Sequence, residues 1–106
     1  MQLPKPIAKY FAADQGQPDA VAECFTEDAV VVDESQTYTG RDAIRRWKEA
    51  ATARYKYTSR PFAFEKQGEK TVVTSRLTGD FPGSPVDLRY AFELDRGRIA
   101  SLKITS

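Results

Sequence analysis

Asp33 is the residue whose type and position in this sequence best suit chemistry. It directly follows the apolar run Ala29–Val32, so it ends a predicted β-strand. An inward carboxylate at this position would lose its water, which suits a general base in proton transfer. The alternative is a solvated strand end, or an Asx-turn formed beside Glu34 and Ser35.

The rest of the composition narrows the chemistry further. The chain has no histidine and one cysteine, Cys24. This excludes the Ser-His-Asp triad, the Cys-His pair, histidine metal sites, thiolate clusters and an intramolecular disulfide. Asp33 and Glu34 have no further ligand spacing around them, so we expect no metal and no cofactor. Proton transfer would therefore fall to Asp, Glu, Tyr or Lys.

Two short helices are predicted near the N-terminus. The first places Ile7, Tyr10 and Phe11 at helical spacing and closes at Asp14-Gln15-Gly16. Pro18 then restarts a helix, because proline is tolerated in a first turn. Three apolar residues share a face of this second helix: Val21, Cys24 and Phe25. We therefore expect the cysteine to fill core volume.

A strand and a longer helix follow. Thr26-Glu27-Asp28 is interpreted as a polar break before the β-branched strand Ala29–Val32. Thr39 and Asp42 have the spacing of a capping box. A third helix is therefore predicted from about Gly40 into the low fifties.

From Tyr55 onward the sequence alternates with the period of a β-strand. The turns between the alternating stretches are too short to hold a crossover helix, so consecutive antiparallel pairing is expected. The predicted strands are Tyr55–Gln67, Thr71–Asp80, Val86–Asp95 and Arg98–Thr105. The fold class is therefore α+β.

Length and charge set the broad class of protein. With 106 residues, we expect residues 1–106 to form a single domain. The 29% of charged residues and the lack of a continuous apolar stretch argue against a signal peptide or a membrane span, so a cytoplasmic location is expected. The net charge of +1 and the absence of a recognition module argue against nucleic-acid binding.

Three stretches of sequence are more specific together than any single element. They are Gly16–Val30 (GQPDAVAECFTEDAV), Tyr38–Ile44 (YTGRDAI) and Phe92–Ile99 (FELDRGRI). In this order they resemble the nuclear-transport-factor-2-like superfamily, in its SnoaL-like and ketosteroid-isomerase-like branch. The resemblance implies a cone of three N-terminal helices packed on a strongly curved antiparallel sheet, with a pocket at the open end. It also implies a homodimer through the sheet.

The resemblance also suggests roles for individual residues. The ketosteroid-isomerase pattern places the catalytic base at Asp33 and requires two oxyanion donors. The donor positions fall on Lys9, next to Tyr10, and on Tyr90, so ketosteroid isomerisation itself is not expected. Tyr90 and Tyr10 are candidate hydrogen-bond donors to a carbonyl. The alternative for Tyr90 is a core tyrosine whose hydroxyl is satisfied.

The implied pocket suits a small hydrophobic or aromatic molecule. The candidate ligand-binding residues are Trp47, Phe11, Tyr38, Tyr57 and Arg76. Core packing is the alternative for Trp47. An inward Arg76 would pair with Asp33 or bind an anionic ligand, whereas an outward one would be solvated or contact a dimer partner.

Two functions remain open from the sequence. The first is cofactor-free proton transfer of the isomerase, cyclase or dehydratase type, with Asp33 as base. The second is a non-catalytic ligand-binding or dimerisation module of the same fold. Ionisable groups in the cavity other than Asp33 would favour the first, and a wholly apolar lining the second.

Overall fold

The computed structural model describes all residues from Met1 to Ser106. Its helices are α1 (Lys5–Ala13), α2 (Pro18–Ala22) and α3 (Arg41–Arg54). Its strands are β1 (Phe25–Asp33), β2 (Gln36–Thr39), β3 (Tyr57–Gln67), β4 (Lys70–Gly79), β5 (Val86–Asp95) and β6 (Arg98–Thr105). The α+β prediction is confirmed, and the last two strands match the predicted bounds at both ends. None of the helices is both long enough and apolar enough to cross a lipid bilayer.

All six strands form one sheet in the order β2-β1-β6-β5-β4-β3. The four long C-terminal strands pair antiparallel and consecutively, as predicted. However, β1 pairs parallel with β6, so the sheet is mixed rather than wholly antiparallel. This pair joins strands far apart in the sequence, and the number of chain reversals between them sets their relative direction. Patterns at neighbouring hairpins do not contain that information.

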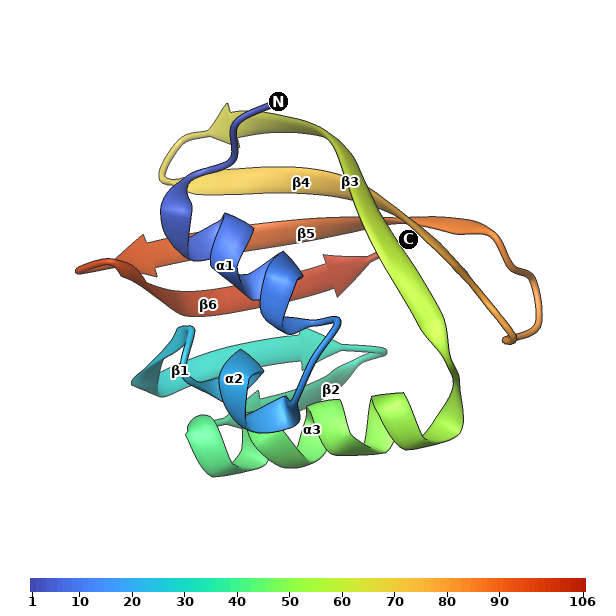
Figure 1. Ribbon diagram of the computed structural model, residues 1–106. Coiled ribbons are helices and arrows are strands. Elements are labelled where there is room, and N and C mark those ends of the chain that lie inside the picture. The colour runs from blue at the N-terminus through green and yellow to red at the C-terminus, as the bar shows by residue number, and fades with distance from the viewer.

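The sheet curves, and the helices lie against it (Figure 1). Register shifts interrupt the ladders between Pro61 and Ala63 in β3 and between Glu93 and Leu94 in β5. Such bulges bend a strand and increase its twist. In Figure 1 the C-terminal end of α3, the β1–β2 turn and the β4–β5 loop all lie at the right side of the molecule.

Three local predictions around α2, β1 and α3 are wrong. The second helix ends at Ala22, so Phe25 begins β1 instead of lying on that helix. Thr26-Glu27-Asp28 lies inside β1 rather than before it, at a register shift between Phe25 and Val30. The N-cap of α3 is Gly40, with φ 88° and no side-chain capping bond, so the capping box of Thr39 does not form. Thr39 pairs with Val30 as part of β2, which fixes its backbone as a strand. Glycine tolerates the positive φ that turns the chain from β2 into α3.

Strand β2 is the element that the sequence did not predict. It forms a hairpin with β1 through Glu34 and Ser35, which both have positive φ. Two-residue hairpin turns of this kind usually contain Asn-Gly or Asp-Gly. Because neither residue is glycine, the usual signal is absent.

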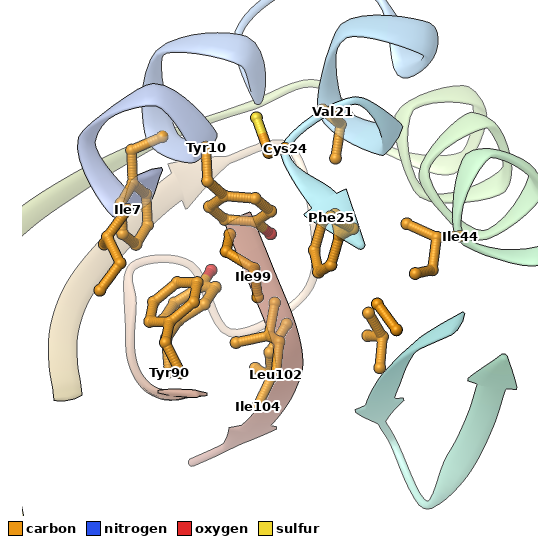
Figure 2. Packing of buried hydrophobic residues seen from close by; sticks show 14 of the residues in the cluster. Ile7, Tyr10, Val21, Cys24, Phe25, Ile44, Tyr90, Ile99, Leu102 and Ile104 are labelled. Carbon is orange, nitrogen blue, oxygen red and sulfur yellow. The ribbon is translucent and has the colours of Figure 1, made fainter. Parts of the chain in front are cut away.

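An aromatic cluster centred on Tyr10 fills the space between α1 and the sheet (Figure 2). Tyr10 is 1% exposed, and its ring centroid lies 5.9 Å from that of Phe25 and 5.5 Å from that of Phe92. Cys24 is also buried, and burial raises the pKa of its thiol. Large apolar side chains therefore fix the helices on the sheet. The open end of the sheet, which this cluster does not fill, forms a cavity.

Candidate functional site

A cavity of about 480 Å³ opens between the C-terminal end of α3, the β1–β2 turn and the β4–β5 loop. Of its 18 lining residues 13 are hydrophobic, including Leu77, Leu88 and Ile104 from the sheet. This size and lining are typical of a small-molecule site. Four ionisable side chains other than tyrosine also line it: Asp33, Glu34, Lys48 and Arg54.

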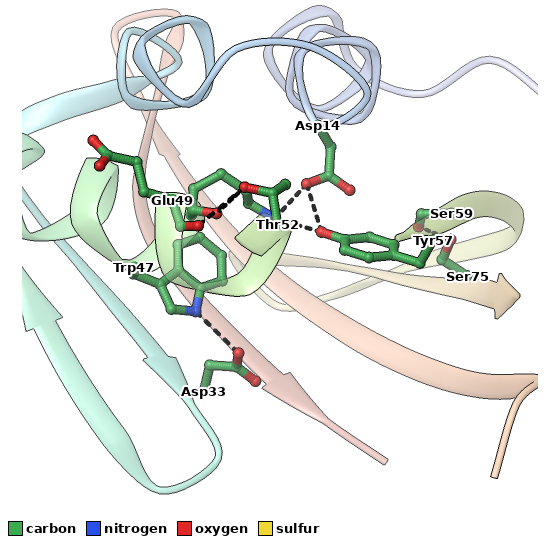
Figure 3. A network of polar contacts seen from close by, with 9 residues as sticks. Asp14, Asp33, Trp47, Glu49, Thr52, Tyr57, Ser59 and Ser75 are labelled. Atoms are coloured by element: carbon green, nitrogen blue, oxygen red, sulfur yellow. Dashed lines mark hydrogen bonds and ion pairs between the residues drawn. The ribbon is translucent and has the colours of Figure 1, made fainter. Parts of the chain in front are cut away.

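Asp33 and Trp47 form one wall of the cavity. Asp33 ends β1, is half-buried, and accepts a hydrogen bond of 3.0 Å at Oδ2 from Trp47 Nε1 (Figure 3). Trp47 is 6% exposed and comes from the inner face of α3. The bond orients the carboxylate through one oxygen and leaves the other oxygen available to a ligand. Trp47 is therefore both a packing residue and part of the cavity wall.

Tyr10 and Tyr90 form a second part of the lining, with ring centroids 6.3 Å apart. Burial, followed by the negative charge of Asp14, raises the pKa of both phenols well above the usual value. Both hydroxyls therefore stay protonated at neutral pH and keep a hydrogen that they can donate.

A buried ion pair that was not predicted joins the cavity-lining Lys48 to Asp14. Lys48 Nζ donates to Asp14 Oδ1 and, over 2.9 Å, to the hydroxyl of Tyr57. The hydroxyl of Tyr57 in turn lies 3.3 Å from Asp14 Oδ1, to which it donates (Figure 3). Asp14 is 5% and Lys48 4% exposed. Burial, with Asp14 next, raises the pKa of Tyr57.

The sequence did contain a signal for this pair. Asp14, the C-cap of α1, lies seven residues after Ile7, and Lys48 lies four after Ile44, so each falls in line with the apolar face of its helix. A charged residue at such a position is either solvated at the edge of the face or buried with a partner. Because 34 residues separate them, local sequence patterns do not show that they pair with each other.

Two of the predicted ligand-binding residues do not reach the cavity. Phe11 is 7% exposed within the aromatic cluster and packs edge-on against Tyr90 at 5.2 Å. It is absent from the lining because one step along a helix turns a side chain by about 100°.

Arg76 points to the outer face of the sheet, so its outward alternative holds. It is exposed, and its guanidinium binds Asp87 at 2.9 and 3.2 Å. The hydrogen bond from Arg76 lowers the pKa of Asp87. Alternation along β4 turns its neighbours Ser75 and Leu77 inward instead.

The remaining predicted residues, Tyr38 and Tyr57, do line the cavity. The ring centroid of Tyr38 lies 6.1 Å from that of Trp47. The structure therefore brings Asp33, Tyr10, Tyr90 and these aromatic residues together around one space. Their roles in catalysis and ligand binding stay predictions.

Comparison with known proteins shows the family and the fold. A family model described as a SnoaL-like domain matches residues 7–102. The chain belongs to the SnoaL-like domain family. A crystal structure from Sinorhizobium meliloti, provisionally assigned as a polyketide cyclase, is 42% identical, with a TM-score of 0.92 over 97% of this chain and 95% of that one. No curated protein matches the sequence of this SnoaL-like protein.

Two more distant structures share the fold of this SnoaL-like domain. A hypothetical protein of ketosteroid isomerase-like fold from Catenulispora acidiphila, in complex with trimethylamine, is 21% identical, with a TM-score of 0.87 over 99% of this chain and 87% of that one. SalBIII, an epoxide hydrolase/cyclase-like enzyme of pyran ring formation in salinomycin, is 22% identical, with a TM-score of 0.80 over 93% and 85%. The fold prediction is confirmed by these likenesses.

Proposed function

We propose that this SnoaL-like protein is a cofactor-free enzyme that transfers a proton on a small hydrophobic carbonyl compound, as a cyclase or isomerase does. The observation that carries the proposal is the Asp33 carboxylate, which Trp47 orients at the wall of an aromatic cavity. The relative from Sinorhizobium meliloti supports it, because its provisional assignment as a polyketide cyclase concerns chemistry of this type.

The lining residues suit distinct parts of such a reaction. Asp33 takes a proton from the carbon next to the substrate carbonyl, and the electron pair of that bond moves towards the carbonyl oxygen. Tyr10 and Tyr90 keep their protons and can donate to that oxygen. Asp33 then returns the proton to another carbon of the substrate. In a ring closure, the carbanion instead attacks a second carbonyl carbon of the substrate, the C=O electron pair moves to that oxygen, and the oxygen takes the proton from Asp33. The flat faces of Tyr38 and Trp47 hold an aromatic substrate in place.

The proposal is tested with benzoylacetone, a flat and enolisable diketone. Exchange of its acidic C–H for deuterium, followed by NMR, measures proton transfer without knowledge of the natural substrate. Asp33→Asn keeps an oxygen for Trp47 but removes the base, so we expect exchange to slow by about 10²–10⁴-fold. The matched control is Asp28→Asn, because Asp28 is an exposed carboxylate of the same strand. Full exchange in Asp33→Asn, with unchanged folding, would remove Asp33 from the mechanism.

A ligand-binding module without catalysis is the second candidate. The mainly apolar lining, 13 of 18 residues, favours it. It predicts that benzoylacetone binds equally to the native protein and to Asp33→Asn, and that neither accelerates exchange. The additional ionisable groups in the lining, Lys48 above all, favour the enzyme instead.

A further inference from the structure

Lys48 is the only lysine or arginine side chain buried in this protein. Burial of an ammonium group is costly, and an aliphatic side chain at the same helical position would avoid that cost. The chain keeps the charge there by supplying a carboxylate from α1, Asp14. The pair is therefore a candidate for a role other than stability.

The geometry leaves part of the ammonium unused. A lysine ammonium has three N–H bonds, and those of Lys48 reach two acceptors in the chain, Asp14 and Tyr57. Lys48 also lines the cavity. One of its three N–H bonds therefore has no hydrogen-bond acceptor in the chain.

Trp47 connects this cation to the proposed base. Its indole N–H donates to Asp33, while Lys48 Nζ lies 4.6 Å from the centroid of the indole ring. The carboxylate and the ammonium are thus placed around one flat side chain. A substrate lying along this wall would meet a proton acceptor at one end and a positive charge at the other.

We propose that Lys48, held by Asp14 and Tyr57, binds the substrate oxygen on which negative charge develops. The inference rests on the proposed function and adds a catalytic residue to it. When Asp33 takes the proton, the C–H electron pair forms a C=C bond and the carbonyl electron pair moves to oxygen. Lys48 donates a hydrogen bond to that oxygen and loses no proton. Asp14 and Tyr57 are positioning residues.

The other cation of the lining is less suited to this role. Arg54 is exposed at the mouth of the cavity, where its guanidinium lies 5.2 Å from the ring of Tyr55. Water and salt screen a charge at the surface far more than a buried one. The lower effective dielectric constant around Lys48 makes an N–H hydrogen bond from it to an oxyanion the stronger one.

The test uses p-nitrophenol as a probe, because its phenolate resembles an enolate and absorbs differently from the phenol in visible light. The background is Asp33→Asn, since an ionised Asp33 would repel the phenolate. We expect the bound probe to ionise at a lower pH than the free probe. Adding Asp14→Asn and Lys48→Met should weaken the ionisation of the bound probe by about tenfold or more, which is one pKa unit.

Matched variants show which cation acts. Lys103→Met removes an exposed lysine of β6 and should leave the probe unchanged. The proposal is overturned if the Lys48 variant ionises the probe as its parent does, if Arg54→Met abolishes the effect instead, or if the Asp33→Asn protein does not bind the probe at millimolar concentration.

A second measurement needs no change at Lys48. In the Asp33→Asn protein, the NMR signal of the Lys48 ammonium should shift as p-nitrophenolate is added, and the signals of exposed lysines should not. Binding of the probe without this shift would contradict the proposal. Neither readout depends on turnover, so the anion site would stand even if benzoylacetone exchange proved independent of Asp33.

Discussion

Asp14 and Asp33 are two carboxylates with sharply different surroundings, since only Asp33 lines the cavity. Asp14 is 5% exposed, pairs with the Lys48 ammonium and accepts from Tyr57. Asp33 is half-buried at the cavity wall and accepts one hydrogen bond, from Trp47. The charge of Asp14 holds a cation in the interior, whereas one oxygen of Asp33 has no hydrogen-bond partner in the chain. A partly or fully buried carboxylate is thus a candidate base only when no cation is paired with it.

The largest expected effect is the difference in stability lost when each of the two carboxylates is removed. Asp14→Ala leaves the Lys48 charge buried and unpaired, which should lower the free energy of unfolding by about 3–5 kcal/mol. Asp33→Ala removes one partly solvated hydrogen bond and should cost about 1 kcal/mol. Urea denaturation of the two variants measures both values.

A charge-free pair is the control for this comparison. In Asp14→Leu combined with Lys48→Met, apolar side chains replace both charges, and stability should return to within about 2 kcal/mol of the native protein. Equal losses of unfolding free energy in Asp14→Ala and Asp33→Ala would show that the ion pair with Lys48 does not make Asp14 more important for stability than Asp33.

Alkaline pH tests the buried phenols beside Asp14. Folding raises the pKa of Tyr10, so the folded chain keeps this proton while the unfolded chain loses it above its ordinary value of 10.0. Stability is therefore unaffected below that pH. Above it, the free energy of unfolding should fall by about 1.4 kcal/mol per pH unit for this tyrosine.

Tyr10→Phe provides the reference for the pH experiment. Denaturation between about pH 9 and about pH 11 should give a shallower fall in this variant than in the native protein. Identical slopes would mean that Tyr10 ionises equally in the folded and unfolded chains.

The hydrogen bond between Trp47 and Asp33 is a smaller contribution. Trp47→Phe removes the indole N–H, and because water can reach the half-buried carboxylate the loss of stability should be about 1 kcal/mol. Proton exchange on benzoylacetone should slow by about tenfold, mainly in kcat, because the base loses its orientation. Unchanged kcat would show that Trp47 does not position Asp33.

The smallest effect is expected on the outer face of the sheet. Arg76→Gln breaks an exposed pair with Asp87 and should leave the affinity for benzoylacetone unchanged, because Arg76 points away from the cavity. Isothermal titration calorimetry checks this expectation. A clear loss of affinity would contradict the conclusion that Arg76 takes no part in ligand binding.

The regular elements were accessible from the sequence because their signals are local. Val86–Asp95 and Arg98–Thr105 were predicted with both ends, since alternation and the Asp95-Arg96-Gly97 turn lie within a few residues. Strand β2 was missed because Glu34 and Ser35 adopt positive φ without glycine. The parallel contact of β1 with β6 was missed because it joins distant strands.

The cavity residues were predicted unevenly for the same reason. Asp33 and Trp47 stand out by their positions in a strand and on a helix face, and both line the cavity. Phe11 and Tyr10 share a helical face in the sequence pattern and are both buried in the core, but only Tyr10 also lines the cavity. Which of two neighbouring residues in a helix points into a cavity depends on how the helix is rotated about its axis on the sheet.

The sequence by itself determined the class of fold, the order of every element except β2, and the exclusion of histidine chemistry, because composition and short-range periodicity carry this information. Only the tertiary structure decided which charges meet. Asp14 and Lys48 come from different helices, and their pairing depends on how α1 and α3 pack against the sheet. Burial then decided that the pair persists, because neither charge could enter the interior without the other.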